Sequence, residues 1–103
     1  MNKMVERIRI EILLDAPLSR LGIELLEGVG VTGYTLFAAS AGAGRSGRWT
    51  DDQLTLADTK VMILTICNLA KAGTIIAAFE PLLESHGIMI IQSSVHVVRS
   101  EKF

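Results

Sequence analysis

Two hydrophobic periods alternate along this chain, and their order constrains the fold more than any other feature of the sequence. Apolar residues at every second position share one face of a strand, whereas apolar residues three or four positions apart form one stripe on a helix. Strand-like segments cover 4–14, 31–39, 59–68 and 88–98, and helical stripes cover 18–26 and 75–86. The predicted order is therefore strand, helix, strand, strand, helix, strand.

The first strand and helix carry clear local signals. One face of segment 4–14 holds Met4, Glu6, Ile8, Ile10, Ile12 and Leu14. This nearly complete apolar set predicts a half-buried strand. Asp15 is placed to cap the helix that follows, and Pro17 suits its first turn. The apolar stripe of that helix consists of Leu18, Leu21, Leu25 and Leu26. Gly28 and Gly30 are expected to end it.

The second half of the chain repeats this arrangement with three irregularities. Segment 59–68 is apolar on both faces, which predicts a central strand covered on both sides. Pro81 falls inside the second helical stripe and predicts a kink or a restart there, and Gly87 ends the helix. In the last strand the pattern changes after Ile91, which indicates a bulge or a change of neighbour.

The element order predicts an α+β fold of the ferredoxin-like βαββαβ type. Such a fold has one four-stranded antiparallel sheet with two helices on one face. The 103 residues suit a single domain covering 1–103. Half of the residues are hydrophobic, which predicts burial beyond one small core. We therefore expect a second copy of the chain to cover the other face of the sheet.

Charge and cysteine content narrow the classes of function. Ten basic residues against eleven acidic ones leave no basic footprint for nucleic acid. No apolar run reaches the roughly 18 residues that span a bilayer, and the N-terminal residues mix charge with apolar side chains, unlike a secretion signal. The single Cys67 cannot form an internal disulfide. These features predict a cytoplasmic protein without membrane insertion.

The stretch 28–49, GVGVTGYTLFAASAGAGRSGRW, combines a strand with a glycine-rich run. Its second half is predicted to be irregular, because Gly42, Gly44 and Gly47 lie close together. Arg45 and Arg48 fall within or beside that run. Bare amides next to fixed positive charge suit an anion such as phosphate. The alternative interpretation is a hairpin tip with solvated arginines.

No constellation for metal binding or catalysis emerges. His86, His96 and Cys67 are too scattered for a metal signature. Glu80 and Glu84 share a helix face, but no base or nucleophile accompanies them. We predict that the protein is not an enzyme and needs no catalytic cofactor.

The glycine pair that ends the first helix, the VTGYT that follows it and the VHVVR at the end of the last strand resemble the PII signal-transduction proteins. The resemblance covers nearly the whole chain and is most specific over residues 30–35. It implies a homotrimer that binds adenine nucleotides in clefts between subunits and reports metabolic state to a protein partner. Members of this family are not usually enzymes.

The resemblance also implies roles for particular residues. Gly33 and Thr35 are expected to line the adenosine, and Arg99 to reach the phosphates from a neighbouring subunit. The phosphates would meet backbone amides and an arginine at the start of the loop. These residues are Ala41, Gly42, Ala43, Gly44 and Arg45.

Three departures from the family pattern change the expected ligand and regulation. The loop has no tyrosine for modification, since the only tyrosine is Tyr34 in the strand. Ile88, in SHGIMI, stands about where the family has a lysine for the outer phosphates, and Glu101 replaces a second terminal arginine. Each lost charge-assisted contact is worth roughly 1.5–3 kcal/mol, so ADP or AMP is predicted to bind better than ATP.

The short GRSGRW loop resembles a PII-like branch associated with inorganic-carbon uptake and carboxysomes. That resemblance implies bicarbonate as a second ligand and a transporter or carbon-fixation component as partner. The anion-site candidates are Arg45, Ser46, Gly47 and Arg48. Arg48 has an alternative role, an ion pair with Asp51 or Asp52. Three alternative roles remain for Trp49: it could anchor the loop, cover the ligand or contact a partner.

Two other classes of protein fit the same architecture. One is a trimeric metal-tolerance protein (CutA-like), against which the poor set of metal ligands counts. The other is a small ferredoxin-like enzyme, for which the sequence offers no acid–base pair.

Overall fold

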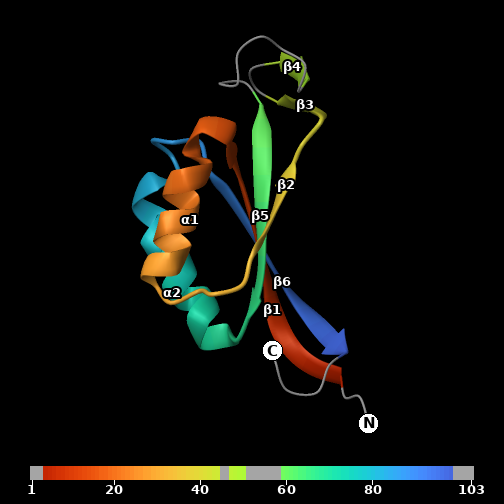
Figure 1. The fold of residues 1–103 in the computed structure, drawn as a ribbon, viewed down its shortest axis with the longest axis vertical. Coiled ribbons are helices and arrows are strands. Elements are labelled where there is room, and N and C mark those ends of the chain that lie inside the picture. Colours follow the sequence, from red (N-terminus) through yellow and green to blue (C-terminus); the bar gives the residue numbers. More distant parts are fainter. Residues whose placement is uncertain (1–3, 45–46, 51–58, 99–103) are drawn as a thin grey trace.

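The computed structural model describes residues 4–44, 47–50 and 59–98. Two helices lie on one face of a four-stranded sheet, and a separate two-stranded hairpin lies beyond one end of it (Figure 1). The strands are β1 (Met4–Asp15), β2 (Thr35–Ala38), β3 (Ala41–Gly44), β4 (Gly47–Thr50), β5 (Lys60–Cys67) and β6 (Met89–Val98). The α-helices are α1 (Ser19–Gly28) and α2 (Leu69–Phe79), with short 3-10 turns at Ala16–Leu18 and Glu80–Leu82.

The sheet has the order β2-β5-β1-β6, with every neighbouring pair antiparallel. Helix α1 connects β1 to β2 with β5 between them, and α2 connects β5 to β6 with β1 between them. This arrangement is the ferredoxin-like fold. The predicted α+β class and the two helices on one face are confirmed, as is the central position of β5.

The hydrophobic core lies between the helices and one face of the sheet. Strand β1 supplies alternate buried residues, as predicted, because its even-numbered side chains from Ile8 to Leu14 are buried on the helix side of the sheet. The largest fully buried side chains are Phe79, Ile10, Ile12, Leu14, Leu26, Ile63 and Ile75. A Cβ atom at Gly22 would lie 3.0 Å from the Cδ1 atom of Ile63, so this buried glycine allows α1 to pack closely on β5.

The helix boundaries confirm one prediction and overturn another. Helix α2 ends at Phe79 and continues as a 3-10 turn that includes Pro81, which is the predicted change at that proline. Asp15 occupies the N-cap position of the first 3-10 turn, but its side chain makes no capping hydrogen bond. The prediction of a capping side chain is wrong because the Asp15 carboxylate pairs with the Lys60 ammonium on the neighbouring strand.

The predicted bulge in the last strand is wrong, and so is the alternative change of neighbour. Strand β6 pairs with β1 in one continuous register from Met4↔Val98 to Leu13↔Met89. Its helix-side residues Gln92 and Ser94 are exposed. The change of pattern after Ile91 therefore reflects the limit of helix cover along β6 rather than a break in the ladder.

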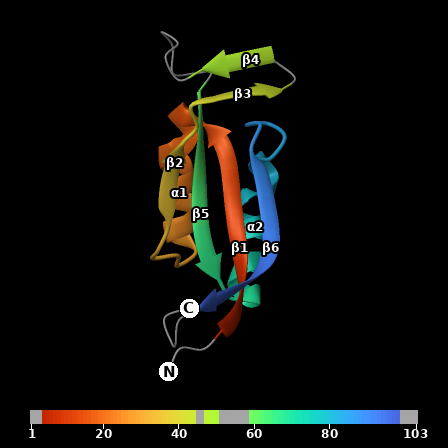
Figure 2. The same cartoon turned by 90° about the vertical axis from the view of Figure 1, so that its right-hand side faces the viewer.

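The stretch 31–50 differs most from the prediction. Regular pairing of β2 begins only at Thr35, so residues 31–34 are not strand. The glycine-rich run, predicted to be irregular, forms the β3–β4 hairpin instead (Figure 2). Gly47 has φ of +98°, a conformation that glycine adopts without steric cost. The alternative interpretation of this run as a hairpin was nearer to the structure.

No helix formed by the described residues lies on the second face of the sheet (Figure 1). The strand registers place four apolar side chains in one row across it, which we call the apolar row: Phe37, Met62, Leu13 and Met89. Phe37 is 45% exposed and Met89 55% exposed. Within one chain β5 is therefore fully covered on its helix side only. Among the described residues, no helix has the length and apolar character needed to cross a membrane.

Candidate functional site

A groove of about 690 Å³ lies at the sheet edge where the chain enters β2. Residues 30–35 form one wall, and residues 64–68 at the end of β5 form the other. Arg7 from β1 and Lys71 from the first turn of α2 complete the lining. Both Gly33 and Thr35, the predicted adenosine contacts, belong to this groove.

The groove exists because two adjacent ladders end at different points. Strand β5 pairs with β1 as far as Cys67, but with β2 only as far as Thr35↔Leu64. Ile66 lines the groove and has no β2 partner on that edge. An edge without a partner strand presents main-chain donors and acceptors to a ligand. Sequence reasoning missed Ile66, since only the strand register identifies it.

Side-chain hydrogen bonds hold the wall formed by residues 30–34. The Thr65 hydroxyl donates to the Gly33 carbonyl oxygen at 2.7 Å, and the Lys71 ammonium donates to the Val29 carbonyl oxygen. Gly30 has φ of +89°, and a Cβ atom there would lie 3.0 Å from the Lys71 Nζ atom. The turn into the groove therefore favours glycine because of its backbone angle, and a larger residue would also displace the end of the Lys71 side chain.

The far end of the groove is polar and positively charged. Asn68 caps α2, because its side-chain oxygen accepts the Lys71 backbone N–H at 2.8 Å. Arg7 donates from Nη1 to the Glu6 carbonyl at 2.8 Å, while its buried Nε atom has no partner among the described residues. Burial raises the pKa of the Cys67 thiol, and the Lys71 ammonium opposes part of that rise. The groove thus favours a neutral thiol and offers two cations.

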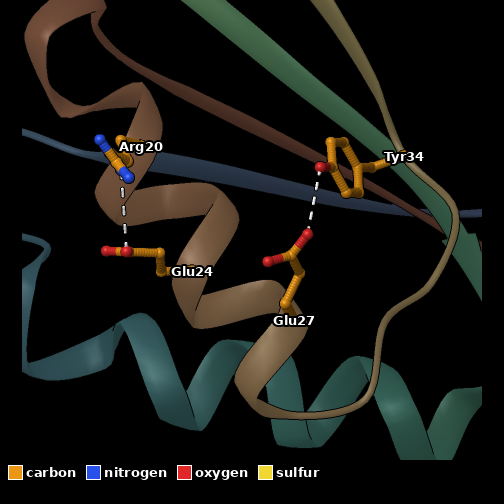
Figure 3. Close-up of polar contacts among 4 residues, drawn as sticks. All are labelled: Arg20, Glu24, Glu27 and Tyr34. Carbon is orange, nitrogen blue, oxygen red and sulfur yellow. Dashed lines mark hydrogen bonds and ion pairs between the residues drawn. The ribbon is translucent and has the colours of Figure 1, made fainter.

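Tyr34 lies on the α1 side of the same segment (Figure 3). Its hydroxyl donates to a Glu27 carboxylate oxygen at 3.4 Å. Desolvation raises the pKa of Tyr34, and the charge and hydrogen bond of Glu27 raise it further. The Arg20–Glu24 ion pair on α1, at 3.9 Å, is exposed. Tyr34 therefore adds a surface contact between α1 and the groove wall.

One chain does not bring the predicted nucleotide residues together. Gly33 and Thr35 line the groove, whereas Ala41–Gly44 form β3 in the hairpin and do not line it. Five residues lie between Thr35 and Ala41, and the hairpin forms a sheet separate from the one that contains β2. The anion candidates Gly47 and Arg48 lie on β4 and are exposed. Arg45, Ser46 and Arg99 lie outside the described residues, as do both proposed partners of Arg48.

The groove also contains residues that sequence reasoning did not select. Arg7, Asn68 and Lys71 belong to its polar end. Asn68 offered a signal, because an asparagine between a strand and a helix is a favoured cap, and Lys71 then falls in the first turn of that helix. The sequence contains no signal that Arg7 lines the groove, since its position near Asn68 follows from the pairing of β1 with β5.

Within residues 4–44, 47–50 and 59–98, no three His, Cys, Asp or Glu side chains gather in a way that could hold a metal ion. The His86 Nδ1 atom lies 2.7 Å from the Ser85 hydroxyl oxygen. That contact involves its neighbour in sequence and lies apart from the groove residues.

Comparison with known proteins places this chain in a family. The family model of nitrogen regulatory protein P-II matches residues 3–102. The chain therefore belongs to the P-II family, which confirms the resemblance found in the sequence. A search of curated proteins gave no match.

Solved structures agree with the family assignment. CPII, a nitrogen regulatory PII-like protein from Thiomonas intermedia K12 bound to ADP, AMP and bicarbonate, has a TM-score of 0.83 and 24% identity, over 94% of this chain and 92% of that one. CPII bound to ADP and bicarbonate has a TM-score of 0.80 and 26% identity, over 94% and 93%. A PII-like signalling protein from Thermus thermophilus has a TM-score of 0.80 and 20% identity, over 98% of each chain.

Proposed function

We propose that this protein is a cytoplasmic, non-enzymatic PII-like regulator that acts as a single domain and binds an adenine nucleotide in the groove. One observation carries the proposal: Gly33 and Thr35 line the groove beside the end of β5, where Ile66 has no partner on β2. Adenine presents alternating hydrogen-bond donors and acceptors, which suit such a main-chain edge. The CPII structures with ADP and AMP support this class of ligand.

The apolar row supports assembly into a homotrimer through the open face of the sheet. The large apolar side chains on this face would stay in water in an isolated chain, and burying them is favourable by about 25 cal/mol per Å². Assembly would also bring Arg99 of a neighbouring subunit to the nucleotide, as the family resemblance implies. The hairpin residues Ala41–Gly44 would supply backbone amides to the phosphates at the same cleft.

The preference for ADP or AMP over ATP is part of this proposal. Ile88, which stands about where the family has a lysine for the outer phosphates, is only 6% exposed and packs in the core. It offers no charge to a third phosphate. Glu101 adds a negative charge in place of an arginine. Isothermal titration of AMP, ADP and ATP tests the order, and tighter binding of ATP than of ADP would contradict it.

Bicarbonate is proposed as the second ligand, with the hairpin as its binding element. CPII has been solved with ADP and bicarbonate, and also with ADP, AMP and acetate. Arg48 is exposed on β4, where its planar guanidinium can meet a small planar anion. Ligand-dependent ordering of this hairpin would change the surface shown to a partner, a transporter or a carbon-fixation component.

The decisive experiment is a calorimetric titration of the purified protein with AMP, ADP, ATP and GTP, with and without bicarbonate. We expect adenine nucleotides to bind and GTP not to bind. Arg45→Ala should weaken nucleotide or anion binding while the protein stays trimeric, and Arg20→Ala on the exposed surface of α1 is the control. A protein that is monomeric and binds none of the adenine nucleotides would contradict the proposal.

A further inference from the structure

The pairing between β2 and β5 stops one hydrogen-bonded pair earlier than the strand register would allow. The Ala39 N–H donates to the Lys60 carbonyl at 3.0 Å, and the register continues to Thr35↔Leu64. Because hydrogen-bonded pairs recur at every second residue of an antiparallel ladder, the next such pair would join Gly33 to Ile66. The two residues do not pair, and they line opposite walls of the groove instead.

The Gly33 carbonyl is engaged from another direction. Thr65 is 3% exposed, and its side chain points to the helix-covered face of β5, as do those of Val61 and Ile63. Its hydroxyl donates to the Gly33 oxygen at 2.7 Å. The carbonyl is therefore turned toward the helices and away from the edge on which the Ile66 amide lies.

A second hydrogen bond holds the start of the same segment. Lys71 reaches from α2 to the Val29 carbonyl at the end of α1. Its Nζ atom lies so close to Gly30 that a Cβ atom there would be 3.0 Å away. The segment 30–34 is thus held at its start by Lys71 of α2 and near its end by the Thr65 side chain on the helix side of β5, rather than by ladder pairing with Ile66.

We infer that Thr65 and Lys71 are positioning residues that keep the groove open. When these hydrogen bonds are absent, Gly33 pairs with Ile66, β2 lengthens toward α1 and the groove closes. Paired strands lie about 4.8 Å apart, which leaves no room for a base against the Ile66 edge. The inference rests on the proposed function for the identity of the ligand, an adenine nucleotide.

The size of the effect follows from populations. If loss of the Thr65 hydroxyl leaves only a tenth of the molecules open, the apparent affinity for AMP falls about tenfold. The same shift protects the Ile66 amide from hydrogen exchange, because the amide then donates to Gly33. Loss of packing alone would weaken binding and speed exchange, so the two measurements together separate positioning from a merely structural role.

The test uses Thr65→Val, which keeps the shape and removes the hydroxyl, and Thr65→Ser, which restores the hydroxyl. Thr74→Val is the matched control, since Thr74 donates to the Ala70 carbonyl at 3.2 Å on the exposed side of α2. We expect Thr65→Val to bind AMP about tenfold more weakly with slower exchange at Ile66. Thr65→Ser should recover AMP affinity and exchange, and Thr74→Val should match the parent protein.

Unchanged AMP affinity in Thr65→Val would overturn the inference, and so would unchanged or faster exchange at Ile66. If Thr65→Val does not fold, Lys71→Met against Lys71→Arg replaces it with the same expected results and the same contrary outcome. The exchange measurement needs no ligand. If the parent protein binds no AMP, the proposed function fails, while faster or unchanged exchange at Ile66 in the variant is what overturns the inference.

Discussion

The two faces of the sheet are built from the same strands, yet they differ in cover. On the helix side Ile10, Ile12 and Ile63 are fully buried, whereas on the other side Phe37 and Met89 are about half exposed. Strand alternation assigns every second residue to each face, so one sequence segment must satisfy two environments. The covered face holds one chain together, and the open face carries the apolar surface through which we propose that the chain assembles.

Charges distribute unequally between the faces as well. Arg9 and Glu11 lie on the open face of β1, with 3.4 Å between Arg9 Nε and a Glu11 carboxylate oxygen. The Arg9 side chain is 41% exposed, so the pair contributes only about 0–1 kcal/mol in one chain. On the covered face, Thr65 is buried with its hydroxyl bonded to Gly33. The Arg9–Glu11 pair thus lies on the face of β1 that the helices do not cover.

The largest expected effect is a cavity on the covered face. Ile63→Ala should lower the free energy of unfolding by about 2–5 kcal/mol, because Ile63 is fully buried against Gly22 and Leu14. Chemical denaturation measures the loss. Leu69→Ala, at a side chain that is 69% exposed, should change stability by no more than about 0.5 kcal/mol. Similar losses in the two variants would erase the difference between core and surface.

A charge placed in the apolar row tests the open face. Met62→Glu should raise the dissociation constant of the assembly about 100-fold, equivalent to about 2.7 kcal/mol, because an unpaired carboxylate would be buried. Sedimentation velocity should show smaller particles with an unchanged circular dichroism spectrum. Met4→Glu, at a methionine that is 66% exposed outside the row, should sediment like the parent protein. An intact assembly of Met62→Glu would place the interface elsewhere.

A smaller effect is expected at the turn where the chain passes from the helix layer to the edge of the sheet. Gly30→Ala should cost about 1–2 kcal/mol of stability, because φ of +89° strains any residue with a Cβ atom and that atom would meet Lys71. Gly28→Ala is the control: nothing lies within 4 Å of its Cβ position, and a gain of about 0.5 kcal/mol is expected. Thermal unfolding compares them, and an equal response would refute the special role of Gly30.

The smallest expected effect concerns the thiol at the covered side of the groove. Burial raises the pKa of Cys67 above its ordinary value, so between these two values the unfolded chain binds fewer protons than the folded one. Stability from this group is full below the unfolded pKa and is lost as pH rises from there through the higher folded pKa. The stability of the parent protein relative to Cys67→Ala should therefore decline over that range. A constant difference would show that the thiol titrates alike in both states.

Much of the fold could be predicted from local patterns. The period of segment 4–14 placed Ile8, Ile10, Ile12 and Leu14 on the buried face, and Pro81 marked the change from α-helix to 3-10 turn, although the helical part ends at Leu82 and not at Gly87 as predicted. Other features could not be predicted locally. Asp15 does not cap the helix, because its carboxylate pairs instead with Lys60, which is 45 positions away in the sequence. The glycine-rich run became a hairpin because pairing between β3 and β4 satisfies backbone groups that glycine leaves exposed.

The candidate site likewise contains some residues that could be predicted from the sequence and others that could not. Gly33 and Thr35 could be selected from the sequence because the family resemblance marks them, and both line the groove. Ile66 and Arg7 could not, because a strand register decides which residues face a groove. The roles that we propose for the hairpin residues involve neighbouring copies of the chain, which local pattern cannot position.

The sequence by itself determined the order of strands and helices, the buried face of β1 and the glycines at turns. These depend on local periods and on backbone angles, which act over a few residues. Only the tertiary structure decided where the β2–β5 ladder stops, which carbonyl Thr65 binds and which charge Lys60 meets. Such contacts join residues that lie 29 to 45 positions apart, so they arise only when the sheet has formed.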